Sequence, residues 1–192
     1  MAKPGHDGAE IRPFRDADEF DAWLAEHHGE PAGVWLKLAK ASSGIPSMTS
    51  DEAVDVGLCW GWISGQRRGL DGDWYLQKYV PRRPRSRWSQ VNVRKVAELT
   101  DAGRMRQPGI AEVEAAQADG RWEAAYVSQK EFTVPDDLHA ALDADPAAAA
   151  AYDALGRTEQ YAVVLDLVTA RDPDTRRDRL DRAVARLGQG TT

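Results

Sequence analysis

Three residues between positions 52 and 59 carry groups that could take part in catalysis. Cys59 is the only cysteine among the 192 residues, and a thiol becomes a nucleophile when a base or a cation lowers its pKa. Glu52 and Asp55 could act as a general base. A free cysteine in an apolar stretch is more often a core residue, and no His stands nearby as a base. These are the candidate catalytic groups, and whether the chain is an enzyme is left open.

A second cluster, over residues 81–92, has side chains that suit binding. Arg82 and Arg83 could hold a carboxylate or phosphate through paired N–H donors, and Ser86, Ser89 and Asn92 could add hydrogen bonds. The cluster reads as a strand end, a proline-rigid turn and a helix start, where free backbone N–H groups favour an anion. The competing interpretation is that the serines cap the helix and the arginines pair with acidic neighbours.

Aromatic residues overlap this basic cluster. Six Trp and Tyr side chains fall within residues 60–88, where they could form a cleft that holds an organic ligand between indole rings and arginines. They could equally form the core between a sheet and its helices. The predicted ligand-binding residues are Trp62, Trp74, Arg82, Arg83, Ser86, Trp88, Ser89 and Asn92.

The charge distribution favours one local anion site. The chain has 25 Lys and Arg against 31 Asp and Glu, for a net charge of −6. Residues 64–95 hold nine of these cations and two carboxylates, so this segment carries +7 and the rest of the chain −13. An acidic chain with one cationic segment suits a small anionic ligand better than nucleic acid, which we do not expect as a partner. A solvated basic face is the alternative.

The sequence disfavours several other classes of protein. The sequence lacks dinucleotide-binding, P-loop, zinc-protease and serine-hydrolase motifs, and the adjacent His27 and His28 cannot both face one metal on a helix. We therefore expect no metal and no cofactor. No apolar run approaches the about 18 residues of a membrane span, and residues 1–10 lack the apolar segment of a secretory signal. The expected location is the cytoplasm, without a membrane partner.

The elements that would position these residues can be predicted from periodicity. Helices are expected over residues 16–29 and from a Thr49–Glu52 capping box into the apolar stretch 56–63, where Gly61 or Gly65 could end the helix. A strand is expected over residues 33–40. Asp71-Gly72 predicts a hairpin between residues 64–70 and 73–80. Further helices are expected at residues 86–100, 108–120, 136–142, 146–155, 158–169 and 173–187.

This order predicts an α+β fold: a small sheet with packed helices, followed by an all-helical C-terminal unit. We place the boundary near residue 130, with an α+β body at residues 13–130 carrying the Trp- and Arg-rich segment and a helical domain at residues 131–188.

Sequence motifs also resemble a known family. The chain contains LCWGWISG at residues 58–65, YVPRRPRSRWSQVN at residues 79–92 and shorter motifs at 103–105, 108–109, 118–122, 134–138 and 175–179. Together these motifs resemble the YdeI/OmpD-associated, or bacteriocin-protection, family over residues 13–188. The resemblance implies a small cytoplasmic α+β protein linked to protection against bacteriocins, antimicrobial compounds or other stress. It implies no particular reaction.

These observations lead to one leading hypothesis and two alternatives. The leading one is a cytoplasmic protein that binds a small anionic or polar aromatic molecule, such as an antimicrobial or natural product, and protects by sequestering it. The first alternative is an enzyme that modifies such a molecule, with Cys59, Glu52 or Asp55 as its catalytic group. The second is a protein-interaction module that uses the C-terminal helices.

Overall fold

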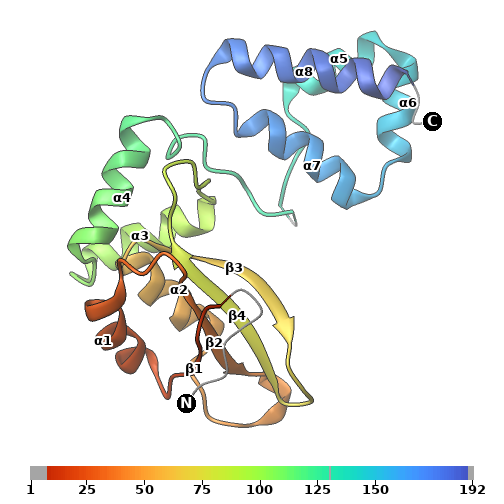
Figure 1. Ribbon diagram of the computed structural model, residues 1–192. Helices are drawn as coiled ribbons and strands as arrows, with labels where there is room; N and C mark the ends of the chain where they lie inside the picture. Colours follow the sequence, from red (N-terminus) through yellow and green to blue (C-terminus); the bar gives the residue numbers. More distant parts are fainter. Residues whose placement is uncertain (1–7, 130, 190–192) are drawn as a thin grey trace. The chain divides into compact units, whose positions relative to one another are not determined.

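The computed structural model describes residues 8–129 and 131–189, which contain a four-stranded sheet and eight α-helices (Figure 1). Two compact units divide the chain. The first comprises residues 1–86 and 94–115, and the second comprises residues 87–93 and 116–192. The expected α+β class is confirmed. Residue 130, where the sequence places the domain boundary, lies outside the described residues, and that boundary stays a prediction.

The sheet of the first unit has the strand order β1-β2-β4-β3. The short strand β1 (Ile11–Pro13), which the sequence analysis did not predict, pairs in parallel with β2 (Val34–Ala39). The expected hairpin is present, since β3 (Trp62–Gly69) and β4 (Trp74–Pro81) are antiparallel partners. β4 lies between β2 and β3, so β3 forms an edge of the sheet.

Helices α1 (Ala17–His27) and α2 (Ser50–Cys59) lie on one side of the sheet (Figure 1). Both begin at capped ends, where the Asp16 carboxylate accepts from the Glu19 N–H and Thr49 and Glu52 form the expected capping box. Their apolar faces meet alternate residues of β2 and β4, which point to one face of the sheet. The buried cluster contains Phe14, Phe20, Leu24, Val34, Leu36, Leu38, Met48, Ala53, Val56, Trp62 and Tyr79.

The helix expected from the Thr49–Glu52 capping box ends just before Gly61, the first of its two expected end points. α2 ends at Cys59, and Gly61 turns the chain with φ +72° before β3 begins at Trp62. A Cβ at Gly61 would lie 2.9 Å from the Pro108 carbonyl oxygen. Glycine therefore permits both the left-handed backbone and the close approach of this later segment.

Helices α3 (Gln90–Asp101) and α4 (Gln107–Ala118) follow the sheet. Within the first unit, the start of α4 packs on the end of α2, because the Arg106 N–H donates to the Cys59 carbonyl over 3.0 Å and Gly109 lies directly against the same carbonyl. Lys95, on α3, reaches back to α2 through Asp55 and Asp51. These contacts hold the later helices against the sheet unit.

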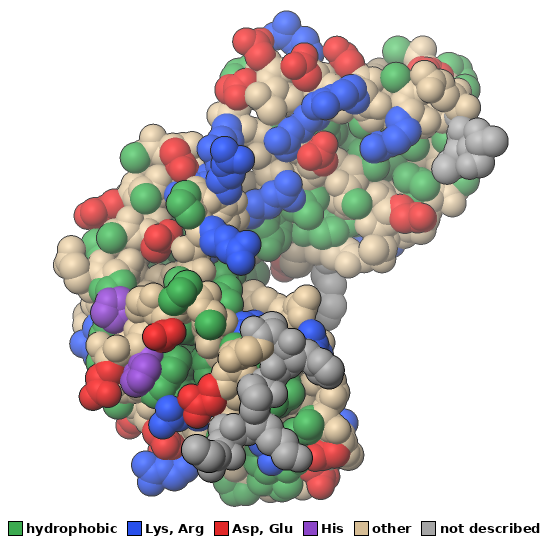
Figure 2. Space-filling model, in the orientation of Figure 1, with side chains coloured by type: hydrophobic (Ala, Val, Ile, Leu, Met, Phe, Trp, Pro, Cys, Tyr) green, Lys and Arg blue, Asp and Glu red, His purple; other side chains and the backbone are tan. Residues whose placement is uncertain are grey.

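The second unit contains the helices α5 (Asp136–Ala144), α6 (Pro146–Ala154), α7 (Arg157–Val168) and α8 (Pro173–Gly188). Asp145 and Asp172 cap α6 and α8 just before the proline of each first turn. Basic and acidic side chains are interspersed over the visible surface of these helices (Figure 2). Their shared core contains Phe132, Leu138, Leu142, Ala148, Tyr152, Val163, Val164, Leu167 and Ala183.

Within the described part of the chain, no helix combines the length and the apolar character needed to cross a membrane.

Candidate functional site

Cys59, the candidate nucleophile, lies in the core of the first unit. Its side chain is 2% exposed at the end of α2. Burial raises the pKa of the thiol, and the nearby charge of Arg104 opposes this shift without reversing it. A thiol with a raised pKa stays protonated at neutral pH and is a poor nucleophile. The structure therefore gives Cys59 the environment of a packing residue.

The two candidate bases are engaged in holding α2. The Glu52 carboxylate accepts from the backbone N–H and the hydroxyl of Thr49, each over 2.8 Å, and the backbone hydrogen bond lowers the pKa of Glu52. Asp55 accepts from Lys95 Nζ over 2.7 Å and lies 3.9 Å from Arg104. Both carboxylates thus have structural partners, and a catalytic role for either of them stays a prediction.

The two tryptophans proposed to flank one ligand lie far apart. Trp62 pairs with Pro81 at one end of the hairpin, whereas Trp74 is seven positions earlier on β4, about 23 Å away at about 3.3 Å per residue. Trp62 is 1% exposed and its Nε1 donates to the His28 carbonyl, so it is a core residue. Trp74 instead lies under Lys37 Nζ, 4.2 Å from the ring centroid, and a small ligand cannot touch both indoles.

The basic turn after β4 does not present its arginines together. Arg82 is 6% exposed, and its backbone N–H donates to the Gly61 carbonyl over 2.9 Å. Arg83 is exposed. Its backbone N–H donates to the Ser86 hydroxyl over 2.9 Å, which closes the proline turn. The Ser86 hydroxyl therefore shapes the turn that precedes α3.

The helix start at Ser89 is already hydrogen-bonded within the second unit. The Ser89 hydroxyl accepts from the Asn92 N–H over 3.2 Å, and the Gln90 N–H donates to the Tyr126 carbonyl over 2.8 Å. Trp88, 1% exposed, packs edge-on against Trp122 with ring centroids 4.9 Å apart. The N–H groups assigned to an anion are thus partly taken by the chain itself, and the predicted anion site here gains no support.

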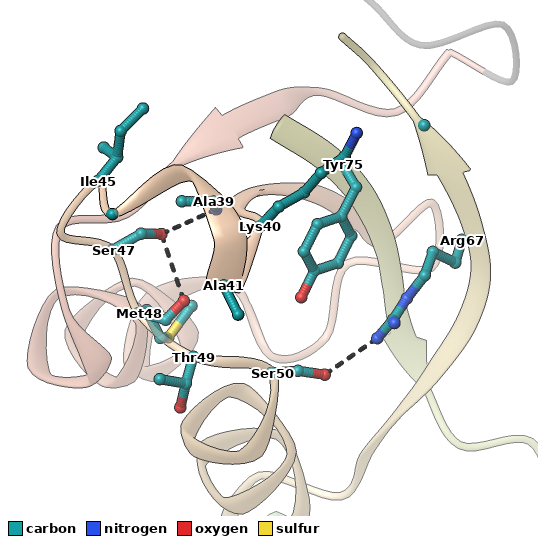
Figure 3. A pocket seen from close by; sticks show the side chains of 12 residues that line it. Ala39, Lys40, Ala41, Ile45, Ser47, Met48, Thr49, Ser50, Arg67 and Tyr75 are labelled. Carbon is teal, nitrogen blue, oxygen red and sulfur yellow. Dashed lines mark hydrogen bonds between the residues drawn. The ribbon is translucent and has the colours of Figure 1, made fainter. Parts of the chain in front are cut away.

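A cavity of about 650 Å³ opens instead in the first unit (Figure 3). It lies between the loop after β2, the first turn of α2 and the β3–β4 hairpin, and its size suits a small organic ligand. Figure 3 shows that the Tyr75 ring and the Arg67 guanidinium both point into it above Ser50. The lining residues are Ala39, Lys40, Ala41, Gly44, Ile45, Ser47, Met48, Thr49, Ser50, Arg67, Gly69 and Tyr75.

Arg67 is held in one orientation at the wall of this cavity. Its Nε donates to Gln77 Oε1 over 2.8 Å and its Nη2 to the Ser50 hydroxyl over 3.1 Å. The guanidinium carbon lies 4.6 Å from the centroid of the Tyr75 ring, a cation–π distance. The chain therefore fixes the plane of the guanidinium through three neutral groups.

The positive charge of Arg67 is left without an internal counter-ion. Within residues 8–129 and 131–189, no carboxylate oxygen lies within 4.0 Å of Arg67 or of Lys40, whose Nζ donates to the Asp71 carbonyl over 2.7 Å. Arginine has five N–H donors, and the two on Nη1 of Arg67 have no partner among the described residues. Arg67 thus lines the cavity with a positioned guanidinium that still has donors available to an anion.

Sequence reasoning missed this site although its signals were present. Arg67 was counted in the cationic segment and Tyr75 in the aromatic arm of the hairpin, but neither was selected as a ligand residue. No sequence motif marked Ser50 or Lys40 as a ligand-binding residue. In the structure, the register places Arg67 opposite Gln77 on the helix-covered face of the sheet, which the sequence pattern of β3 does not reveal.

Among the described residues, no group of three or more His, Cys, Asp and Glu side chains has an arrangement that could hold a metal ion.

Two protein families match parts of the chain. A family described as a domain of unknown function, DUF8412, matches residues 12–112, and the family described as "Bacteriocin-protection, YdeI or OmpD-Associated" matches residues 131–190. The resemblance to the bacteriocin-protection family is thereby confirmed, in the C-terminal segment. The motifs at residues 58–65 and 79–92 lie in the segment that DUF8412 matches. No curated protein and no solved structure matches the chain.

Proposed function

Because the chain belongs to the DUF8412 family of unknown function, and because residues 131–190 match the bacteriocin-protection family, we propose a binding role that confers protection. The chain binds a small anionic molecule in the cavity beside Arg67 and sequesters it in the cytoplasm. The ligand is an antimicrobial or a natural product with an organic body.

One observation carries this proposal. The Arg67 guanidinium is fixed by Gln77, Ser50 and Tyr75 at the wall of a cavity of about 650 Å³, with no carboxylate within 4.0 Å in the described chain. Arg67 is exposed, yet its Nε, its Nη2 and the face of its guanidinium are held by neutral groups, so the side chain is positioned while its charge stays available. A clamped arginine whose remaining donors face a cavity is suited to bind a ligand.

The geometry supports binding better than catalysis. Cys59 is buried with a raised pKa, and Glu52 and Asp55 are hydrogen-bonded to residues that hold α2. None of these three residues lines the cavity. A hydrolytic or group-transfer role would need a nucleophile or base within hydrogen-bond reach of the ligand.

A binding screen with two arginine variants tests the proposal. A set of small carboxylates, sulfonates and phosphates is screened against the full chain by thermal shift, and each compound that raises the Tm is measured again with Arg67→Gln and Arg83→Gln. Loss of the shift in Arg67→Gln places the ligand in the cavity, whereas loss in Arg83→Gln alone places it at the predicted basic turn. Arg68→Gln, on the opposite face of β3, is the matched control.

A cellular assay then tests protection. Cells that express the chain are challenged with a panel of anionic antimicrobial compounds beside cells that express Arg67→Gln at the same level. Survival that depends on Arg67 supports sequestration, and equal survival of the two strains contradicts it.

A further inference from the structure

The cavity beside Arg67 favours a negatively charged ligand, and its lining also restricts the shape of that ligand and the number of its charges. We propose that the ligand is an amphipathic monocarboxylate, with its carboxylate on Arg67 and its apolar body along Ala39, Ile45 and Met48. This inference rests on the proposed function, since it specifies the molecule that the same cavity holds.

The orientation of the guanidinium favours a planar anion. Gln77 engages Nε and Ser50 engages Nη2, so the plane of Arg67 is set before a ligand arrives. The unused donors on Nη1 lie in that plane, next to the remaining N–H of Nη2. A carboxylate can accept two parallel hydrogen bonds from this end of the guanidinium. The Tyr75 hydroxyl, which points into the cavity and has no partner among the described residues, can donate a third.

The charges around the cavity favour a single negative charge. The first turn of α2 carries Asp51 and Glu52, and Glu52 already occupies the backbone N–H of the N-cap Thr49. The helix start is therefore filled by the chain's own carboxylate and repels a second anion nearby. A dianion such as a phosphate monoester feels twice this repulsion and also twice the attraction of the lining cations Arg67 and Lys40, but its desolvation cost rises with the square of its charge, so a monoanion loses less on entering the cavity.

The rest of the lining favours an apolar body. Ala39 at the end of β2 and Ala41 and Ile45 in the segment that follows are apolar lining residues, and the buried Met48 lines the cavity as well. Ile45 is 38% exposed, one of the large hydrophobic side chains left open to solvent. A hydrocarbon or aromatic body of a ligand would cover it and remove apolar surface from water.

Isothermal titration calorimetry of the full chain with matched probes tests the inference. The probes are octanoate and 2-naphthoate, their amides, the corresponding monophosphates (octyl and 2-naphthyl phosphate) and acetate. At least one of the two carboxylates is expected to bind at least about 10-fold more tightly than its amide, its phosphate and acetate. Arg67→Gln should weaken that binding at least about 10-fold and Arg67→Lys by a smaller factor, because lysine keeps the charge without the planar donors.

The controls separate two kinds of failure. Arg68→Gln, on the opposite face of the same strand, should leave the affinity within about twofold of the native chain. If a phosphate binds as tightly as its carboxylate, or acetate as tightly as octanoate, and Arg67→Gln abolishes that binding, the monocarboxylate assignment is overturned while the anion-binding function stands. If no anionic probe binds, or if Arg67→Gln changes nothing, both are overturned.

Discussion

Arg67 Nε donates to Gln77 Oε1 over 2.8 Å, and the two residues are direct cross-strand partners on β3 and β4. Gln77 is 4% exposed, and its amide nitrogen donates to the carbonyls of Gly65 and Gln66, at the irregularity in register between Ser64 and Arg67. Such irregularities redirect side chains near functional sites. Here the backbone of the edge strand fixes a buried amide, and that amide fixes the arginine at the cavity.

Two substitutions of Gln77 should separate the effect of the charge of Arg67 on ligand affinity from the effect of its position. Gln77→Glu keeps the acceptor for Nε but adds a carboxylate that neutralises the guanidinium, so carboxylate affinity should fall at least about 10-fold, and the Tm should also drop because Glu cannot donate to the Gly65 and Gln66 carbonyls. Gln77→Leu removes the anchor and keeps the charge, so the affinity should fall less, while the Tm drops because the Gly65 and Gln66 carbonyls lose their donor. Calorimetry and thermal unfolding measure the two effects. Unchanged affinity in Gln77→Glu would show that Arg67 does not carry the binding.

Cys59 should react slowly in the native chain. Burial raises the pKa of its thiol, so the thiolate fraction at pH 7–8 should fall below that of a free cysteine, whose pKa is about 8.5. Labelling with Ellman's reagent should be slow in buffer and rapid in urea. The labelling rate of the native chain should increase only at a higher pH than the labelling rate of a free cysteine. Cys59→Ala should retain ligand binding. Rapid labelling of the native chain at pH 7 would instead indicate an activated thiol.

The ion pair between Lys95 and Asp55 should stabilise the first unit. The side chains are 17% and 22% exposed and their charged atoms lie 2.7 Å apart. Burial lowers the pKa of Lys95, but the hydrogen bonds to Asp55 and Asp51 outweigh it and the pKa is raised. Asp55→Asn should therefore lower the free energy of unfolding by about 1.5–3 kcal/mol in urea titrations, the cost of weakening a charged hydrogen bond.

Asp51→Asn is the matched control for this pair. Asp51 lies 2.9 Å from the same Lys95 nitrogen, but its side chain is 78% exposed, so its loss should cost at most about 1 kcal/mol. A larger loss from Asp51→Asn than from Asp55→Asn would contradict the assignment. Ligand affinity that falls in Asp55→Asn without loss of stability would support a functional role for this carboxylate.

The second unit should lose stability in acid through Asp137. Arg176 donates to both oxygens of this carboxylate, over 2.6 and 2.9 Å, and holds its pKa below the usual value. A carboxyl group whose pKa is lowered in the folded state stabilises the fold at pH values above its unfolded pKa of about 3.9. This stabilisation is lost as the pH falls through the pKa of the folded state. Urea unfolding of the native chain should weaken over this range, and Asp137→Asn should be less stable at pH 7 with a flatter acid profile. Asp174→Asn, whose side chain is 89% exposed, should show neither change.

Local rules in the sequence determined most of the elements. The capping box at Thr49 and Glu52, the Asp71-Gly72 hairpin and the aspartate–proline starts of α6 and α8 use contacts between residues a few positions apart, so they can be read without a fold. Strand β1 has only three residues, too few for a pattern, and it exists because β2 offers an edge for parallel pairing. The apolar run from Val56 to Ile63 leaves the end of α2 open between Gly61 and Gly65, because a buried helix and a buried strand can have the same composition.

The sequence by itself determined an α+β chain with a helical C-terminal segment and one cationic, aromatic-rich region in an otherwise acidic protein. It could not determine which of those cations is available to a ligand. Trp62 and Arg82 became buried, Ser89 bonded to its own helix, and Arg67 was aimed into a cavity by Gln77, ten residues along the chain. Those outcomes depend on strand register and on which partners the fold brings within hydrogen-bond distance. Only the tertiary structure decides such distances, because a charge pattern along the chain does not record them.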